Sequence, residues 1–225
     1  MKNFSLPNRC VAVALLFAGA CGVASAQSDG SVIPVKSIEG EFSLGFTYPW
    51  TKYNSGKRQV GAEMGLELRY NIPESKWDIG VLLNVNTTDY KFRHTTLTDN
   101  AHWNEDWSQI DWDADHSGHL TAESHNDVLS NSSFGIQLVA DYNFGQGRRV
   151  NPFVGLGIGL GGNSSDDLDY CSTPDGSHFV MRPRVGVELF HHVRLSLSSN
   201  INRYGYNNLA LSLGLVIGGR PKKAK

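Results

Sequence analysis

Apolar and polar residues alternate with a period of two along eight separate stretches of this chain. Successive side chains of a β-strand point to opposite faces, so this period predicts strands with one apolar and one polar face. Most of the stretches are about ten residues long, which is the length that a tilted strand needs to cross a bilayer. The predicted strands are 39–48, 61–71, 77–87, 133–143, 152–161, 179–189, 193–200 and 209–218.

The connections between these strands alternate in length. Segments 72–76, 145–151 and 191–192 are short, whereas 49–59, 91–131, 162–177 and 201–207 are mostly longer. Short periplasmic turns and longer external loops are typical of outer-membrane barrels. No apolar run approaches the roughly 18 residues of a membrane-spanning helix, so strands are the predicted spanning elements.

The two strand faces differ in a way that separates a membrane barrel from a soluble one. The apolar face has almost no polar interruption, and its many large side chains would overfill the narrow interior of an eight-stranded barrel. The polar face carries carboxylates and arginines that can pair across a lumen: Glu39, Glu41, Glu63, Glu67, Asp141 and Glu188 with Arg69, Arg182, Arg184 and Arg194. We therefore predict an all-β fold, an eight-stranded antiparallel up-and-down transmembrane β-barrel, over a soluble lipid-carrier type of barrel.

Aromatic residues cluster near the predicted strand ends. We expect two girdles at the membrane interfaces, one formed by Tyr48, Trp50, Tyr90 and Phe92, the other by Tyr70, Trp77, Tyr142 and Phe144. Glycine occupies every second position from 155 to 161 on the polar face of one strand. These glycines are expected to make room for luminal neighbours such as Arg182 and Arg184, the alternative being a gap for a ligand or a file of water.

The first 26 residues have the pattern of a secretory signal peptide. Lys2 and Arg9 precede the apolar run 11–17, and Ala24-Ser25-Ala26 forms a small-residue cleavage site. The alternative is a lipoprotein signal, in which Cys21 would be lipidated. Either signal indicates export, and we expect the cell outer membrane of a Gram-negative bacterium. The predicted organisation is a signal peptide (1–26), an N-terminal periplasmic segment (27–37), the barrel (38–219) and a basic periplasmic tail (220–225).

Charge and cysteine content narrow the range of functions. The net charge of −2 for the whole chain argues against binding to nucleic acid. If the signal peptide is removed, Cys171 is the remaining cysteine, so an intramolecular disulfide is not expected.

Three stretches on the predicted strands resemble those of known small outer-membrane barrels. They are Asp141-Tyr142-Asn143-Phe144, the run 151–157 (NPFVGLG) and the run 183–188 (PRVGVE). With the Glu/Arg lumen and the alternating loops, they resemble the OmpX and OmpA-transmembrane class and the general outer membrane protein β-barrel domain family. The resemblance implies the barrel architecture. It departs from the pattern at the end of the last strand, where Ile217 stands in place of the aromatic residue that often serves as an assembly signal.

The segment 91–131 holds the residues with most potential for binding. It contains five histidines, three tryptophans, and eight acidic against two basic residues. The run Asp113-x-Asp115-x-Ser117-Gly118 resembles the start of an EF-hand loop, in which alternate oxygen ligands surround Ca²⁺. However, Ser124 stands where a bidentate glutamate is needed, and Glu123 comes one residue early. Whether the region Asp111–Glu123 binds calcium is left open, and Zn²⁺ binding through His116 and His119 lacks a clear third ligand.

One stretch can be compared with the catalytic motif of a lipid A deacylase. The pattern His-x-Ser-Asn of that enzyme type corresponds to Leu197-Ser198-Ser199-Asn200, with leucine at the position of the general base. A serine without a base is not activated as a nucleophile. We therefore expect a protein that is not an enzyme and assign no catalytic, cofactor-binding or metal-binding residues.

The sequence predicts an integral outer-membrane barrel, with monomeric form expected, that displays its external loops for adhesion, recognition or envelope integrity. Its expected partners are outer-membrane lipid and lipopolysaccharide, and an extracellular ligand or host surface contacted through the acidic loop. The alternatives are a narrow channel for ions or small solutes and a lipid A-modifying enzyme.

Overall fold

The computed structural model describes residues 34–52, 56–98, 102–103, 110–111, 121–165, 176–202 and 207–218. The predicted signal peptide, Cys171 and the basic tail lie outside the described residues. The strands are β1 (Ile38–Pro49), β2 (Lys57–Arg58), β3 (Gly61–Asn71), β4 (Trp77–Thr98), β5 (His102–Trp103), β6 (Ile110–Asp111), β7 (Thr121–Asn143), β8 (Val150–Ser165), β9 (Gly176–Leu189), β10 (Val193–Asn202) and β11 (Asn208–Ile217). A search of this described part found no helix with the length and apolar character needed to cross a membrane.

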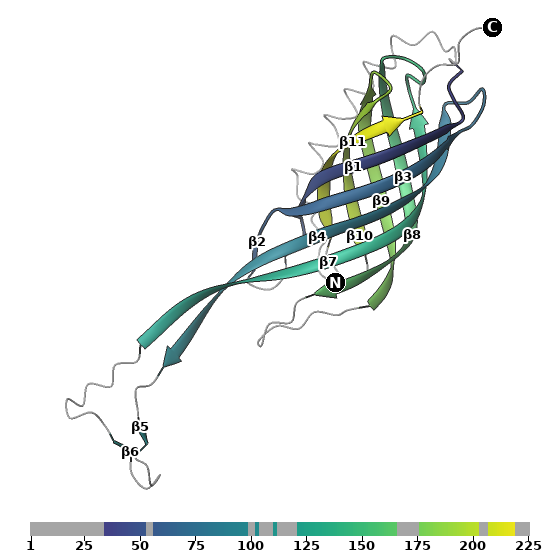
Figure 1. Cartoon of the computed structure of the whole chain (residues 1–225). Coiled ribbons are helices and arrows are strands. Elements are labelled where there is room, and N and C mark those ends of the chain that lie inside the picture. Colours follow the sequence, from purple (N-terminus) through teal and green to yellow (C-terminus); the bar gives the residue numbers. More distant parts are fainter. Residues whose placement is uncertain are drawn as a thin grey trace, which may run out of the picture.

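Eight of these strands form a closed antiparallel barrel (Figure 1). The ring runs β1-β3-β4-β7-β8-β9-β10-β11, and each strand pairs with the next one along the chain, β2 and the β5–β6 hairpin aside. Pairing of β1 with β11, from Gly40 opposite Ile217 to Pro49 opposite Asn208, closes the ring. The predicted eight-stranded up-and-down barrel is confirmed.

The polar face of every barrel strand lies inside and the apolar face lies outside. Along β3 the burial alternates strictly, with the odd-numbered positions from Gly61 to Asn71 buried and the even-numbered ones exposed. Leu138 is 66% exposed and Phe46 is 70% exposed, whereas Arg69 is 1% exposed. A water-soluble barrel would show the opposite arrangement, since exposed apolar patches of this extent are not found on soluble monomers. The chain is therefore a transmembrane β-barrel.

The two ends of the barrel differ. The turns β3–β4, β7–β8 and β9–β10 are short and lie at the end where β1 begins and β11 finishes. In the β9–β10 turn, Phe190 and His191 both have positive φ (54° and 63°), and His192 N–H donates to the carbonyl of Leu189 at 3.1 Å. Leu189 pairs with Val193, so three residues, two of them in the left-handed region, reverse the chain in this hairpin. By the outer-membrane rule for turn length, this end is periplasmic.

Two strands are longer than the alternation predicted. β4 continues past Thr87 to Thr98, and β7 begins at Thr121 instead of Ser133. The segment predicted as an external connection from Lys91 onward therefore starts as a two-stranded ribbon. Outside the membrane both faces of a ribbon meet water or other polar groups, so a polar and apolar alternation is not required there. The signal that predicted the barrel strands is consequently weak in the ribbon.

Candidate functional site

The periplasmic end of the lumen is closed by a layer of amide and carboxylate side chains. Asn71 Nδ2 donates to Glu39 Oε1 at 2.6 Å, and Asn143 Nδ2 donates to Asp78 Oδ2 at 2.7 Å. Asn151 Nδ2 in turn donates to Asn143 Oδ1 at 2.9 Å. All five side chains belong to residues no more than 5% exposed. Strand parity places them inside, because each lies one residue away from an outward apolar or aromatic neighbour.

Two arginines, Arg184 and Arg194, fill the centre of the lumen. Arg184 contacts two carboxylates, with Nη2 2.7 Å from Glu67 Oε1 and Nε 2.8 Å from Asp141 Oδ1. Arg194 also pairs with Asp141, and its guanidinium carbon lies 3.5 Å from the centroid of the Phe153 ring. This is a close cation–π contact in a desolvated setting.

Arg69 and Arg182 extend the charge network toward the two ends. Arg69 lies 3.3 Å from Glu39, 3.0 Å from Glu41 and 3.8 Å from Glu67. Arg182 Nη1 donates to Glu63 Oε2 and to Asn200 Oδ1, both at 3.0 Å. The predicted pairing of luminal carboxylates with arginines is thus confirmed for all four arginines. It does not extend to Glu188, which is buried and has no ion-pair partner among the described residues.

Amide and hydroxyl groups continue the network toward the extracellular end. Asn200 Nδ2 donates to Asn208 Oδ1 at 2.8 Å, and Asn208 Nδ2 donates to Asn86 Oδ1 and Thr88 Oγ1, both at 2.9 Å. On the other wall, the side-chain amide atoms of Asn131 are buried and form no hydrogen bond to described protein groups. Buried amides of this kind are ordinarily satisfied by ordered water.

The β8 glycines make room for this network. A Cβ at Gly155 would collide with the Asp141 carboxylate, and one at Gly157 would lie 2.7 Å from Gln137 Oε1 and 3.4 Å from Arg182 Cβ. The expectation that these glycines accommodate large luminal neighbours is therefore confirmed, but the neighbours are Asp141 and Gln137 of β7. Arg184 and Arg182 are the cross-strand partners of Gly155 and Gly157 in β9, and Arg182 would only be in ordinary van der Waals contact with the added Cβ.

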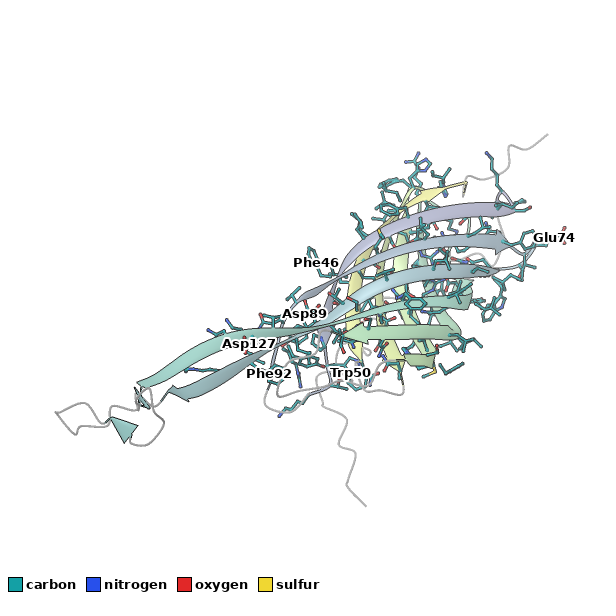
Figure 2. The ribbon with its side chains drawn as sticks, turned by 60° about the horizontal axis from the view of Figure 1, so that its bottom comes forward. Phe46, Trp50, Glu74, Asp89, Phe92 and Asp127 are labelled. Carbon is teal, nitrogen blue, oxygen red and sulfur yellow. The ribbon has the colours of Figure 1, made fainter. Side chains whose placement is uncertain are left out.

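The β4–β7 ribbon projects from the extracellular end of the barrel (Figures 1 and 2). Ten residue pairs, from Asp89 opposite Ser130 to Thr98 opposite Thr121, continue the ladder past the last pair that adjoins the barrel. At about 3.4 Å per residue this adds roughly 30 Å. Figure 2 shows Asp89, Phe92 and Asp127 in the part of the ribbon nearest the barrel, with Glu74 at the opposite end of the molecule.

Buried apolar side chains anchor the base of the ribbon. Tyr90 and Leu129 face each other across the ladder, and both are 0% exposed. Phe92 is 6% exposed and its ring lies against Gly56, while the Tyr90 hydroxyl donates to the Thr51 carbonyl at 3.3 Å. The ribbon is therefore packed against the segment between β1 and β3.

This packing corrects the aromatic girdle predicted for the extracellular rim. Tyr48 is 46% exposed on the outer face, in agreement with the prediction. Tyr90 and Phe92 share the inward parity of Asn86 and Thr88, so their rings point inward and the prediction that they form part of the lipid-facing girdle was wrong. The periplasmic girdle is confirmed: Trp77 packs on Tyr142 at 5.2 Å between ring centroids, and Tyr142 packs on Phe144 at 5.1 Å.

Two lysines lie side by side at the extracellular rim. Lys57 of β2 is the direct cross-strand partner of Lys91 of β4. Lys91 has the outward parity of Val85 and Thr87 and lies beyond Val85, an exposed apolar residue of β4. Like charges directly opposite each other in a sheet are destabilising unless an anion compensates them. The sequence does not predict this pair, because β2 is only two residues long and is too short to show an alternating pattern.

The remaining candidate residues are only partly described. Asp113 to Leu120, including His116 and His119, lie outside the described residues, and nothing is known of the side chains of Glu123 and Ser124. In the part of the chain that is described, no group of three or more His, Cys, Asp or Glu side chains is arranged to hold a metal ion.

The stretch compared with the deacylase motif has structural contacts. Ser199 Oγ accepts a hydrogen bond from Trp50 Nε1 at 3.1 Å and donates one to the Asn208 carbonyl at 3.2 Å. Asn200 belongs to the luminal network. His192 lies in the periplasmic turn, where its Nδ1 is 3.3 Å from the Val216 carbonyl. The hydrogen bonds of Ser199 thus connect β10 to β11 and to the start of the β1–β2 connection.

A closed eight-stranded barrel with a charge-paired interior and an apolar exterior defines a small transmembrane barrel of the outer-membrane type. Neither a scan against protein-family models nor a search of curated proteins gave a match for this chain. Similar solved structures are small outer-membrane barrels, as the sequence resemblance implied. The assignment to this class follows from the chain's own strand order, closure and facing.

Three solved structures illustrate the likeness. The attachment invasion locus protein Ail of Yersinia pestis, in complex with the heparin analogue sucrose octasulfate, is 12% identical with a TM-score of 0.43, over 80% of this chain and 99% of that one. The N-terminal β-barrel domain of Pseudomonas aeruginosa OprF is 13% identical with a TM-score of 0.42, over 81% and 99%. Neisserial surface protein A is 14% identical with a TM-score of 0.45, over 80% and 96%.

Proposed function

We propose that this outer-membrane barrel is a non-enzymatic protein that holds the β4–β7 ribbon above the cell surface for adhesion or recognition. The observation that carries the proposal is the ribbon itself: ten residue pairs extend from the barrel and are fixed at their base by buried Tyr90, Phe92 and Leu129. A two-stranded hairpin alone is marginally stable in water, so anchoring at the base supports a display role.

The partner of the ribbon is proposed to be a basic surface. The segment 91–131 carries eight acidic and two basic residues, and six of the acidic ones lie between 99 and 120. Such a charge imbalance attracts cationic partners over about a Debye length, which is about 8 Å at physiological salt. Binding should therefore weaken as the salt concentration rises.

The proposal can be tested with two truncations that the ladder makes possible. Thr88 lies opposite Asn131, and Thr98 lies opposite Thr121, so an Asn-Gly type I′ turn can join either pair. The first variant removes the ribbon and the second removes only its tip. Cells that carry the full chain should adhere to a polylysine surface several-fold better than cells that carry either variant, and 0.5 M salt should abolish the difference.

A different outcome would point to another role. If adhesion is the same for all three proteins while the truncated strains take up a hydrophobic dye faster, the ribbon serves envelope integrity and the adhesion proposal is wrong. Heat-modifiable migration of each purified variant controls for barrel folding. Retention by polyglutamate in place of polylysine would contradict the proposed charge preference.

Contact with lipopolysaccharide is the second part of the proposal. The Lys57–Lys91 pair lies beyond the exposed apolar side chains of β4, and this position supports contact with the phosphate groups of lipopolysaccharide. Lys57→Gln with Lys91→Gln should lower the amount of lipopolysaccharide that copurifies with the barrel. Lys52→Gln, at an exposed position of the β1–β2 connection, serves as the control for loss of a lysine elsewhere at this end of the barrel. Equal copurification in all variants would remove this part of the proposal.

The alternative functions have weaker support. Four arginines and their carboxylate partners occupy the lumen, and the unpaired amide of Asn131 is the observation that favours water entry from the extracellular side. A channel would require single-channel conductance after reconstitution. A lipid A-modifying enzyme would require a changed acyl-chain pattern of lipid A in cells, yet Leu197 stands at the base position and the Ser199 hydroxyl is already hydrogen-bonded.

A further inference from the structure

The lipid-facing surface of the barrel is not uniformly convex, because it contains an apolar groove of about 680 Å³ across β3, β4, β7 and β8. Most of its walls are outward-facing side chains of four strands and of the start of β1. The walls include Ile38, Leu68, Ile79, Leu138, Leu156 and Ile158.

A small residue lies in the floor of the groove. Ala140 lines the groove and is the cross-strand partner of Ile79 on one side and of Leu156 on the other. Leu138 and Tyr142 are its outward neighbours along β7. A longer aliphatic side chain at this position would fill part of the groove.

The groove lies in the periplasmic half of the apolar band. Tyr70 is one of its walls, and Tyr142 of the Trp77–Tyr142–Phe144 cluster is two residues from Ala140. Tyrosine and tryptophan rings concentrate at the level of lipid headgroups. The groove therefore opens toward the headgroup region of the periplasmic leaflet.

One cation lies just beyond that end of the groove. Lys36 is two residues before Ile38 and has the same outward parity, so it is within about 7 Å along the chain of a groove wall. It has no ion-pair partner among the described residues. Lys76 of the β3–β4 turn precedes outward-facing Trp77 and therefore has the inward parity of Asp78.

We propose that the groove is a binding site for an anionic phospholipid of the periplasmic leaflet. One acyl chain lies in the groove over Ala140, and the phosphate lies against Lys36. A second copy of this chain is the less favourable occupant, because two barrels that met at this face would bring their lysines together. The site is independent of the ribbon and of its proposed function.

Native mass spectrometry of the purified full-length protein tests the site with defined lipids. The protein is mixed with phosphatidylglycerol or phosphatidylethanolamine that carry the same acyl chains. The expected result is retention of one phosphatidylglycerol molecule at least threefold above phosphatidylethanolamine. Ala140→Leu should reduce retention of both lipids. Lys36→Gln should abolish only the preference for phosphatidylglycerol, whereas Lys76→Gln, on the inward face of the β3–β4 turn, should leave that preference unchanged.

Ala62→Leu is the matched control. Ala62 is also exposed on the outer face, but it lies near the extracellular end of β3, and its substitution should leave lipid retention unchanged. All variants should keep heat-modifiable migration, since the substituted positions are outside the lumen. Equal retention of the two lipids by the unmodified protein, or no effect of Ala140→Leu, would overturn the proposal. A dimer that Ala140→Leu dissociates would also overturn it, in favour of a second copy as the occupant.

Discussion

Asp141 lies where the luminal charges converge. Its carboxylate accepts hydrogen bonds from Nε and Nη2 of Arg184, both at 2.8 Å, and also pairs with Arg194. Removing one partner of a buried ion pair leaves the other charge uncompensated, which typically costs about 3–5 kcal/mol. Glu188 is also buried but has no ion-pair partner among the described residues, so no ion pair offsets the free-energy cost of its desolvation.

These contacts predict opposite effects of two isosteric substitutions. Asp141→Asn should lower the free energy of unfolding by about 3–5 kcal/mol, whereas Glu188→Gln should leave it unchanged or raise it by up to about 1 kcal/mol. Urea unfolding of the barrel in lipid vesicles, followed by tryptophan fluorescence, measures both. A loss of several kcal/mol in Glu188→Gln would mean that this carboxylate has a partner in the folded protein.

Strands β7 and β8 pack closely because glycines of β8 have no side chains. At Gly155 an added methyl group would occupy the space of the Asp141 carboxylate, whereas at Gly40 it would meet nothing within 4 Å. Gly155→Ala should therefore destabilise the barrel by about 1–3 kcal/mol, the usual cost of overpacking. Gly40→Ala should be neutral or slightly stabilising. The temperature at which each protein loses its compact migration on a detergent gel compares the two, and equal temperatures would contradict the prediction.

The β9–β10 turn stores strain at residues with a Cβ. His191 has a φ of 63°, in the left-handed region that costs roughly 1–2 kcal/mol for most residues with a side chain. His191→Gly should therefore raise the unfolding free energy by about 1 kcal/mol. His192→Gly is the control, because His192 is outside the left-handed region and its Nδ1 lies 3.3 Å from the Val216 carbonyl. Stabilisation by both substitutions would show that the turn strain is not the cause.

Alternation predicted the barrel strands because lipid on one side and a packed lumen on the other impose opposite polarities on neighbouring residues. Where a strand no longer lies between lipid and lumen, alternation no longer predicts which way its side chains face. The aromatic character of Tyr90 and Phe92 predicts a place in the girdle, but their inward parity places them at the base of the ribbon. Lys57 and Lys91 become neighbours only through the register of β2 with β4, which a two-residue strand cannot reveal in advance.

The charged part of the candidate site was largely predictable, and its amide part was not. Five of the six predicted carboxylates pair with the four arginines, as expected for charges buried in a closed barrel. Asn71, Asn143, Asn151 and Asn208 form hydrogen bonds that depend on which side chains meet across the lumen, and this is set by the stagger of all eight strands together. Local sequence carries no record of that stagger.

At the scale of the whole molecule, the barrel and the ribbon should be separable. The ring of eight strands closes through pairs that do not include residues 89–130. A protein in which Asn-Gly joins Thr88 to Asn131 should therefore still migrate as a compact form when unboiled and shift on heating. Loss of the compact form would mean that the packing of Tyr90, Phe92 and Leu129 is required for closure of the ring.

The pairing of β1 with β11 has a consequence for how the barrel is assembled. These two strands come from opposite ends of the described chain, so a ring that lacks either one has two free edges. In hydrocarbon each unpaired backbone group at such an edge costs several kcal/mol, and an open sheet is not a viable membrane structure. Partly closed forms are therefore excluded from the bilayer interior, and insertion must be coupled to closure of the ring in one cooperative step.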